Sequence, residues 1–327
     1  MAIGRRWWLG AAAVWVAVNA AVLVIEPGTV PFDWPSHHGA LTGIRKVVDA
    51  QFVLLQVVAL GCVAWWMTRR RPDPAIALRA PEARVSRIET YALIGYAIGA
   101  QLVGVMVGSA FGWHPFGFHL AGTLVGSSMP VSPAEAVGWA VYNGIVYALL
   151  PFLWFRRRYT TAQLCLRSSD RRGDLRLILV VLVLEAVLQL TALGHSFGDL
   201  RPAQLTVAVP LTIGLYLLGT VLPTTIFVQA LLVPRYARLT GSLGGTLALG
   251  GLTYAALHIF EGWSRFGTIR DVTLTILFVV LVYAVPGAFK TLLTVRTGNA
   301  WVHAWAYHAF APHTLHDTGL VARIFRL

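Results

Sequence analysis

Charged residues are scarce in this chain of 327 amino acids. Asp, Glu, Lys and Arg make up 12% of the sequence and hydrophobic residues 57%, whereas a soluble globular domain carries about 25% charged residues. The mean hydropathy is +0.66, and one apolar run extends over residues 177–193. This composition excludes a soluble domain and predicts an all-α, polytopic membrane protein.

Cysteine is scarce too, which excludes a disulfide framework. Cys62 lies in an apolar run and Cys165 in an arginine-rich loop, so we expect no pairing between them. Low-complexity segments and strong internal repeats are also lacking. Residues 1–21 have the basic start and apolar middle of a signal peptide but lack a small-residue cleavage site, so we expect a retained first helix or signal anchor.

The formal net charge of +12 comes from arginines in short clusters between apolar runs. Nucleic-acid binding would require a basic face on a soluble module, and the sequence contains none. Short basic clusters are typical of loops held in the cytoplasm by the positive-inside rule. We therefore expect no nucleic-acid partner and a surface in contact with membrane lipids.

A helix needs about 20 apolar residues to cross about 30 Å of hydrocarbon. The sequence accordingly predicts about eight or nine spans, at residues 7–25, 47–67, 91–113, 137–155, 177–194, 205–233, 243–260, 272–293 and 300–311. The last segment is short, and we expect it to belong to a longer helix that starts near Gly298.

Arginine distribution predicts the orientation. Clusters lie before the first span and within 69–87 and 156–176, whereas the loop 114–136 lacks Lys and Arg altogether. This alternation predicts a cytoplasmic N-terminus and an outer position for the loop 114–136. We expect an integral protein of a bacterial plasma membrane.

The chain divides into two parts by its ionisable residues. Residues 1–176 contain N-terminal membrane helices with arginine-rich loops. Residues 177–327 place ionisable side chains in or beside expected spans, where they are costly and indicate function; these are Glu185, His258, Glu261, His303, His308, His313 and Asp317.

His258 and Glu261 share a helix face if the helix continues past Tyr254, because residues three apart are neighbours. An imidazole and a carboxylate at this spacing can bind one metal. The alternative is that His258 bonds to a neighbouring helix and Glu261 lies in an outer loop.

His303 and His308 are five residues apart, about 140° around a regular α-helix. The two imidazoles are therefore not expected to face one site. We favour His308 as the functional residue and a packing role for His303. His313, His316 and Asp317 follow Pro312 and are expected at the outer surface.

Residues 222–312 resemble the core of the CAAX-protease and bacteriocin-processing (CPBP, or Abi) family of intramembrane metalloproteases. The family's Glu-Glu-x-x-x-Arg helix with a following Pro-Arg falls on 224–229 and 234–235, and its Phe-x-x-x-His on 254–258. Its Thr-Gly-Asn/Ser-x-Trp turn matches 297–301, and its His-x-x-x-Asn falls on 308–312. The resemblance implies a helix-bundle fold, a divalent metal such as zinc, and a prenylated-peptide or membrane-protein substrate.

The residues that align with the family's catalytic positions differ from the family pattern. Thr224 and Thr225 stand where the family has glutamates, and Gln229 stands where it has arginine. Hydroxyls cannot act as general bases near pH 7, and Gln lacks the charge of Arg. Thr225 and Gln229, four residues apart, can instead join helices by hydrogen bonds.

We expect the first of three functions, because both glutamates and the arginine of the family pattern are replaced in this chain. The first is a catalytically diverged or inactive homologue that serves as a membrane scaffold or peptide-binding protein. The second is an active metal peptidase whose replacement base is Glu261 or Glu185. The third and weakest is a transporter. The candidate site comprises His258 and His308 as catalytic and metal-binding residues, Glu261 as a catalytic residue, and a cavity lined by Thr224, Thr225, Gln229 and Tyr254.

Overall fold

The computed structural model describes residues 5–25, 43–121, 130–192, 199–262 and 264–327. The expected segments that fall partly outside these ranges are the N-terminal anchor, the loop 114–136 and the end of the span 177–194. Within the described ranges all regular structure is helical, without a strand. The all-α prediction is thus confirmed for this part of the chain.

In the described part of the chain, four helical stretches are long and apolar enough to cross a membrane: Ala83–Ala110, Pro133–Arg156, Pro202–Thr240 and Ile269–Thr297. Shorter apolar helices run over Leu9–Val22 and Leu54–Thr68. The composition and length of these helices fit a helical membrane protein, as the sequence predicted.

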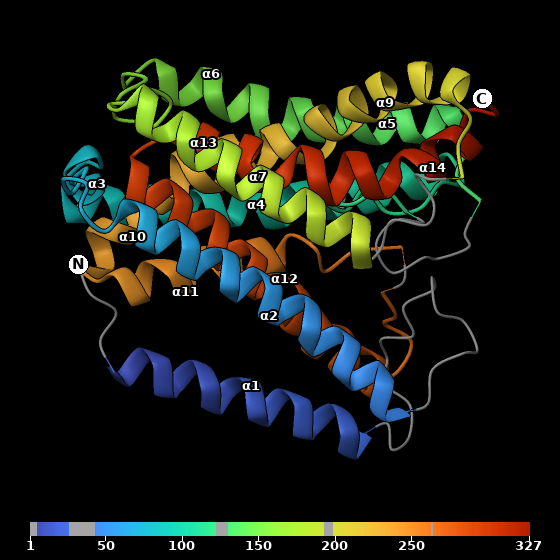
Figure 1. The fold of residues 1–327 in the computed structure, drawn as a ribbon, viewed down its shortest axis with the longest axis horizontal. Helices are drawn as coiled ribbons and strands as arrows, with labels where there is room; N and C mark the ends of the chain where they lie inside the picture. The colour runs from blue at the N-terminus through green and yellow to red at the C-terminus, as the bar shows by residue number, and fades with distance from the viewer. Residues whose placement is uncertain (1–4, 26–42, 122–129, 193–198, 263) are drawn as a thin grey trace.

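The helices run roughly along the long axis of the molecule (Figure 1). In chain order they are α1 (Arg5–Ile25), α2 (Gly43–Thr68), α3 (Ile76–Arg79), α4 (Ala83–Ala110), α5 (Pro133–Asn143), η2 (Gly144–Leu149), α6 (Leu150–Arg156), α7 (Arg171–Ala192), α9 (Pro202–Tyr216), η3 (Leu217–Val221), η4 (Thr224–Leu232), α10 (Val233–Thr240), α11 (Leu243–Ala256), α12 (Ile269–Thr297), α13 (Trp301–His303), η5 (Ala304–His308), η6 (Phe310–Leu315) and α14 (His316–Ile324). The η segments are π-helical.

Helix boundaries follow local signals that the sequence carries. Ser132 caps α5 by accepting a hydrogen bond from the Glu135 amide, with Pro133 in the first helical position. Thr268 caps α12 in the same way, and Gly298 ends that helix with φ of 67°, which a residue without Cβ adopts easily. The short expected segment 300–311 belongs, as predicted, to a longer helical run that begins at Trp301 and ends at Ile324.

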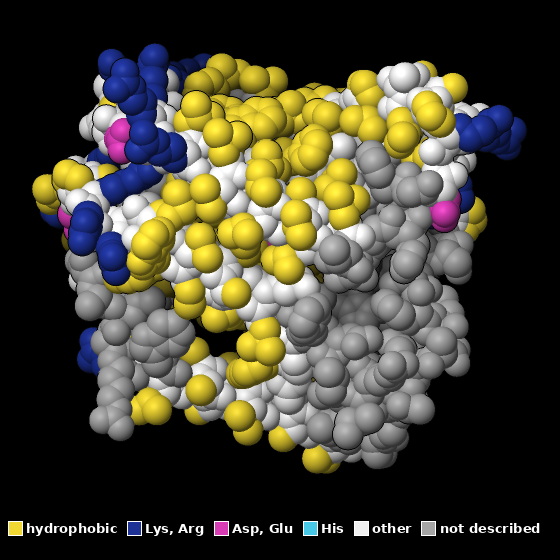
Figure 2. All heavy atoms as spheres, in the orientation of Figure 1, with side chains coloured by type: hydrophobic (Ala, Val, Ile, Leu, Met, Phe, Trp, Pro, Cys, Tyr) yellow, Lys and Arg dark blue, Asp and Glu magenta, His cyan; other side chains and the backbone are white. Residues whose placement is uncertain are grey.

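The two arginine-rich segments meet at one end of the molecule. Arg79 donates to the carbonyl of Gly298 at 2.7 Å and to that of Ala162 at 3.2 Å. Arg71 pairs with Asp174 at 2.8 Å. Figure 2 shows Lys and Arg side chains gathered at the ends of the face drawn and hydrophobic side chains covering its middle. Basic side chains at the ends and apolar side chains in between are typical of a protein whose middle lies in the hydrocarbon layer of a membrane.

Helices α11 and α12 pack at very short range because glycines line their contact. A Cβ added to Gly251 would lie 2.4 Å from the carbonyl oxygen of Ala284, and one added to Gly287 would lie 2.6 Å from Cβ of Tyr254. Small residues at helix contacts in membranes permit such close approach. The packing fixes the position of Tyr254, which carries part of the site described next.

Candidate functional site

His258 follows directly after α11, where the helix ends in a tight turn. Its amide donates to the carbonyl of Ala255 at 2.9 Å, and its Nδ1 lies 2.7 Å from the carbonyl oxygen of Tyr254. Nδ1 must carry the proton to make this bond, so Nε2 presents its lone pair. That Nε2 is buried and has no hydrogen-bond partner within the described residues.

His119 approaches from the loop between α4 and α5. Side chains of Trp139 and Asn143 each donate to the carbonyl of Gly117 at 2.8 Å and hold this loop. Gly117 also permits the close passage of the segment after α11, since a Cβ there would lie 2.6 Å from the carbonyl oxygen of Phe260. The packing of these two segments places His119 beside His258, with ring centroids 4.7 Å apart.

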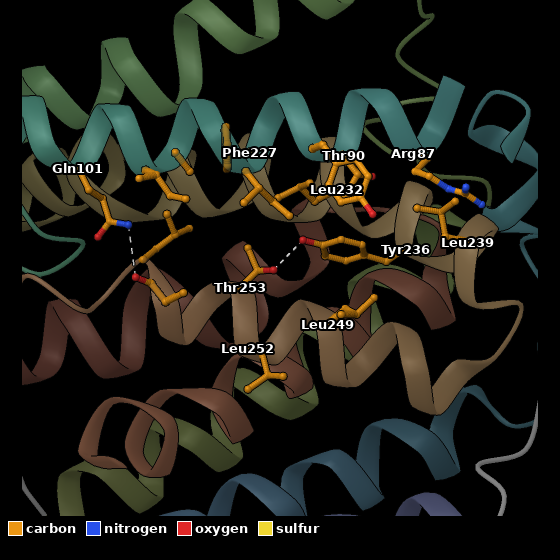
Figure 3. Close-up of a pocket in the computed structure, with 16 residues that line it drawn as sticks. Arg87, Thr90, Gln101, Phe227, Leu232, Tyr236, Leu239, Leu249, Leu252 and Thr253 are labelled. Carbon is orange, nitrogen blue, oxygen red and sulfur yellow. Dashed lines mark hydrogen bonds between the residues drawn. The ribbon is translucent and has the colours of Figure 1, made fainter. Parts of the chain in front are cut away.

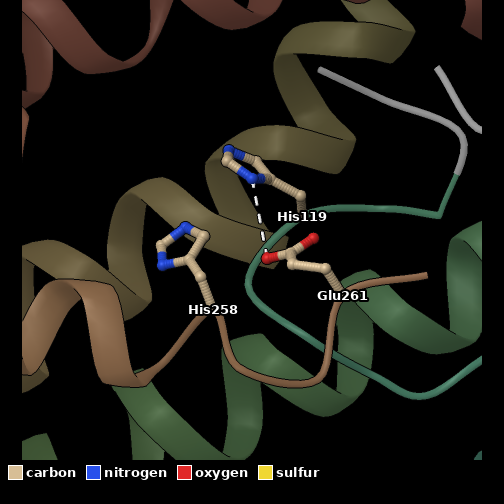
Figure 4. A group of neighbouring side chains, drawn as sticks. All are labelled: His119, His258 and Glu261. Carbon is tan, nitrogen blue, oxygen red and sulfur yellow. Dashed lines mark ion pairs between the residues drawn. The ribbon is translucent and has the colours of Figure 1, made fainter. Parts of the chain in front are cut away.

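Glu261 completes a buried trio with His119 and His258 (Figure 4). One donor atom from each residue lies within 4.8 Å of the others. Nδ1 of His119 is 3.7 Å from Oε1 of Glu261 and 3.3 Å from the hydroxyl of Tyr283. The three side chains are 0–3% exposed, so the trio is withdrawn from solvent.

Burial shifts the pKa values of Glu261 and His119 in opposite directions. It raises the pKa of the Glu261 carboxyl well above its usual range, because a charged form without water is costly. It lowers the pKa of His119 well below its usual range for the same reason, with a further decrease from neighbouring imidazoles. His119 is therefore neutral at pH 7, the state in which an imidazole coordinates a metal.

The trio consists of residue types that could hold a divalent metal of the zinc type. Neutral imidazole nitrogen and carboxylate oxygen are established zinc ligands, and ligands 2.0–2.1 Å from a tetrahedral zinc lie about 3.4 Å from one another. The donor atoms of the trio lie within 4.8 Å of one another, so they would have to approach by up to about 1.4 Å to hold one such ion. Two of the buried atoms involved, Nε2 of His258 and Oε1 of Glu261, have no hydrogen-bond partner in the described ranges.

A second group of imidazoles lies in a row formed by His303, His308 and His313. The ring centroids are 5.7 Å apart from His303 to His308 and 5.1 Å apart from His308 to His313. All three side chains are 0–1% exposed. The expectation that His303 and His308 diverge is wrong, because it assumed a regular α-helix.

The row forms because the backbone here is π-helical. The segment Ala304–His308 is η5, and the amide of Ala309 donates to the carbonyl of Ala304, five residues earlier, at 2.8 Å. Hydrogen bonds of this i→i+5 kind place residues five apart on one side of the helix. A spacing that separates two imidazoles in an α-helix thus brings them together.

The expected surface position of the last polar residues is also wrong for two of the three. His313 and Asp317 are each 1% exposed and pair at 3.1 Å. His316, whose side chain is 24% exposed, pairs with the other oxygen of Asp317 at 3.0 Å. These residues lie inside because helix α14 continues the row inward instead of forming a loop after Pro312.

Tyr254 links the trio to the row. Its hydroxyl lies 3.3 Å from Nε2 of His308, while its carbonyl oxygen accepts from His258. The ring of His119 lies 5.1 Å from that of His313, which gives a second link. His308, which the sequence analysis expected to bind a metal with His258, belongs to the row. The trio contains His119 instead of His308.

The polar residues that the sequence analysis compared with Glu-Glu-x-x-x-Arg are buried and neutral. Thr224, Thr225 and Gln229 are each 0% exposed. Thr225 donates to the carbonyl of Val221 at 2.7 Å and lies 3.2 Å from Nε2 of His303, so it borders the row.

Gln229 donates to the hydroxyl of Thr291 at 3.4 Å. Among the described residues, no hydrogen bond joins Thr224 or Gln229 to a histidine. Three of the expected cavity residues therefore differ in role: Thr225 reaches the histidines, Gln229 joins two helices, and Thr224 has a buried hydroxyl without a partner within the described ranges.

Two further residues complete the surroundings. Lys290, which the sequence analysis did not single out, is 2% exposed and places its ammonium 3.6 Å from the ring centroid of Tyr254. Glu185, the other candidate for a replacement base, accepts from Gln189 at 2.9 Å on α7. No hydrogen bond or ion pair joins Glu185 to a histidine in the described part of the chain.

His119 is the residue that sequence reasoning missed. It lies in an irregular loop without helical periodicity, so no spacing relates it to His258. One signal is the run Phe116-Gly117-Phe118-His119, in which glycine permits the close approach of another segment.

Comparisons with known proteins add no relative: no protein-family model matches the chain, and no curated protein or solved structure matches it.

Proposed function

We propose that this chain is a membrane-embedded metalloprotein that hydrolyses peptide bonds at a centre held by His119, His258 and Glu261. One observation carries the proposal: three side chains of metal-ligating type converge in a buried place with donor atoms within 4.8 Å of one another. A buried carboxylate is costly without a compensating charge, and a divalent cation supplies one.

The chain's own residues have defined tasks in this proposal. His258 offers Nε2 because the carbonyl of Tyr254 holds the proton on Nδ1, and His119 offers a neutral imidazole. Oε1 of Glu261, which lacks a hydrogen-bond partner within the described residues, would be the carboxylate ligand of a bound metal, and the second oxygen of this carboxylate would accept the proton of the attacking water. A bound divalent metal such as zinc supplies Lewis-acid chemistry and makes water more acidic.

The resemblance to CPBP proteases supports a peptide substrate. It covers residues 222–312, which include Tyr254, His258, Glu261 and His308. On this basis we propose a membrane-protein or prenylated-peptide substrate and an arrangement of eight or nine spans. The arginine clusters at one end of the molecule support a cytoplasmic N-terminus in a bacterial plasma membrane.

A second candidate function is peptide binding or scaffolding without turnover. Thr224, Thr225 and Gln229 favour it, because these buried neutral side chains replace the carboxylates and the arginine of the family motif. Hydroxyls supply neither a base nor a strong metal ligand. The two functions differ in whether Glu261 compensates for the missing glutamates.

Metal analysis of the purified protein tests the centre. We expect about one zinc-type ion per chain in the wild type and at least a 10-fold loss of metal affinity in Glu261→Gln and His258→Ala. Glu185→Gln is the matched control, because Glu185 is also buried but bonds to Gln189 on α7. Absence of metal from correctly folded wild type, or equal retention by both Glu→Gln variants, would refute the centre.

Peptide cleavage then separates the two functions. A prenylated peptide and a membrane-embedded peptide are incubated with wild type, Glu261→Gln and Glu185→Gln. Cleavage by wild type and Glu185→Gln but not by Glu261→Gln supports hydrolysis, since general-base catalysis alone contributes about 10²–10⁴ in rate. Binding of a peptide by the metal-loaded wild type without cleavage supports the scaffold.

A further inference from the structure

A groove runs along the outside of α4, between this helix and the hairpin of α10 and α11 (Figure 3). Its volume is about 620 Å³, within the range of small-molecule sites. Its walls are mainly apolar and include Ile94, Ala97, Phe227 and Leu252. The groove is separate from the histidines, although its far end reaches Leu257, the residue before His258.

The groove opens toward the surrounding lipid. Side chains along its rim are large, apolar and exposed: Ile98 is 56% exposed, Leu252 49% and Leu249 38%. Ile98 lies on α4, a helix long enough to span a membrane, where exposed apolar side chains face hydrocarbon. An occupant therefore enters sideways from the bilayer and is itself apolar over most of its length.

One end of the groove carries the features of a membrane interface. Arg87 lines this end, is exposed, and has no carboxylate partner among the described residues. Tyr91, which is 68% exposed, lies one turn further along α4, and tyrosine is enriched at the level of lipid headgroups. The other end is closed where Gln101 donates to the carbonyl of Ala256 at 3.3 Å.

The length of the groove matches one leaflet. Arg87 and Gln101 are fourteen residues apart on α4, which corresponds to about 21 Å at about 1.5 Å per residue. Half of a bilayer of about 40–45 Å, headgroups included, is about 20–22 Å. A lipid with its headgroup at Arg87 thus ends its chain near Gln101.

Thr90 provides a hydroxyl at the depth in the membrane where a phospholipid has its ester carbonyl. It lines the groove three residues after Arg87, is 5% exposed, and its hydroxyl has no hydrogen-bond partner within the described ranges. The offset along the helix axis is about 4.5 Å. In a glycerophospholipid the ester carbonyl lies below the phosphate, so it can accept this hydroxyl proton while Arg87 binds the phosphate.

We propose that this groove is a binding site for an anionic glycerophospholipid. One acyl chain lies between α4 and α11, the ester carbonyl accepts from Thr90, and the headgroup pairs with Arg87. The charge of Arg87, which has no carboxylate partner among the described residues, favours an anionic headgroup over a zwitterionic one. This site is independent of the proposed metal centre.

Photo-crosslinking in nanodiscs tests the proposal on the full chain. The probes are phosphatidylglycerol and phosphatidylcholine with the same diazirine-bearing acyl chain, and mass spectrometry maps the adducts. We expect labelling of residues 91–101 and 249–257 to favour phosphatidylglycerol about fivefold, the contribution of one Arg near an anionic surface. Arg87→Gln should abolish this preference, while Arg84→Gln, exposed on the same helix but outside the groove, should retain it.

Two variants fill the groove from opposite walls, so that misfolding of one leaves the test intact. Ala97→Trp acts from α4 and Ala256→Trp from α11, and each should reduce labelling at least fivefold. Ala92→Trp, at an exposed position of α4 outside the groove, is the matched control and should label as wild type. Equal labelling by both lipids, or unchanged labelling in both groove-filling variants when folded, would overturn the proposal.

Discussion

Replacing Arg235 by alanine removes the cation from a buried ion pair with Glu89. Nε and Nη2 of Arg235 donate to the same oxygen of Glu89 at 2.8 and 2.6 Å, and the guanidinium also lies over the ring of Phe155 at 4.7 Å. Arg235 is 2% exposed and the Glu89 side chain 11%. Arginine suits this position because its planar group bonds and stacks at once.

The expected cost follows from what is left behind. In Arg235→Ala, Glu89 keeps one donor, the hydroxyl of Tyr159 at 2.7 Å, and stays buried without its counter-ion. Breaking a buried pair by removing one partner costs about 3–5 kcal/mol in free energy of unfolding. The double variant Arg235→Met/Glu89→Leu leaves no unpaired charge and should lose much less, within about 2 kcal/mol of wild type.

Reversible unfolding by SDS in mixed micelles, followed by circular dichroism, measures these free energies. The double-mutant cycle of Arg235→Ala and Glu89→Ala should give a coupling energy of about 2–3 kcal/mol. A loss below about 1 kcal/mol in Arg235→Ala would show that water or other groups compensate the charge. A larger loss in the Met/Leu double variant than in Arg235→Ala would refute the reasoning.

Three further predictions concern packing, reactivity and topology. Gly251→Ala should destabilise the protein by about 1–3 kcal/mol in SDS unfolding, because the added Cβ would lie 2.4 Å from a backbone oxygen. Gly95→Ala, with open space around the added Cβ, should be neutral or slightly stabilising. Equal effects of the two substitutions would contradict the packing argument. Burial raises the pKa of the Cys165 thiol to about 11, so in a Cys62→Ser background Cys165 should resist maleimide at pH 8 and react after denaturation in SDS; rapid labelling of the native protein would show an accessible thiolate. A cysteine at Ser169, exposed in the arginine-rich segment after α6, should be labelled only from the cytoplasmic side, and labelling from outside intact cells would reverse the topology.

The helical architecture could be predicted from the sequence because membrane spans are long and apolar. The expected spans 91–113, 137–155, 205–233 and 272–293 each overlap a helix long and apolar enough to cross a membrane. Their ends were less well predicted. Helix α4 begins at Ala83, so it contains Arg84 and Arg87, because a basic first turn does not end a helix at the membrane surface.

Part of the candidate site could be predicted as well. His258, Tyr254, His308 and Thr225 were chosen for their spacing, and the structure joins them through contacts in one buried region. Their chemical roles stay predictions. His119 could not be found, because its place beside His258 depends on two irregular segments that pack together.

The π-helical geometry of η5 and η6 has a consequence for how such a site arises and is lost. An i→i+5 hydrogen bond encloses one residue more than an α-helical bond, so a row of imidazoles five apart is compatible with a single inserted residue in an ordinary helix. Deleting one alanine between His303 and His308 would replace the i→i+5 hydrogen bond by an α-helical one and leave the two imidazoles four residues apart, still on one side of the helix. The unchanged sequence wound as a regular α-helix would instead separate them by about 140°. The row therefore depends on the π-helical hydrogen bonds, and the loss of one residue is a change that it can tolerate.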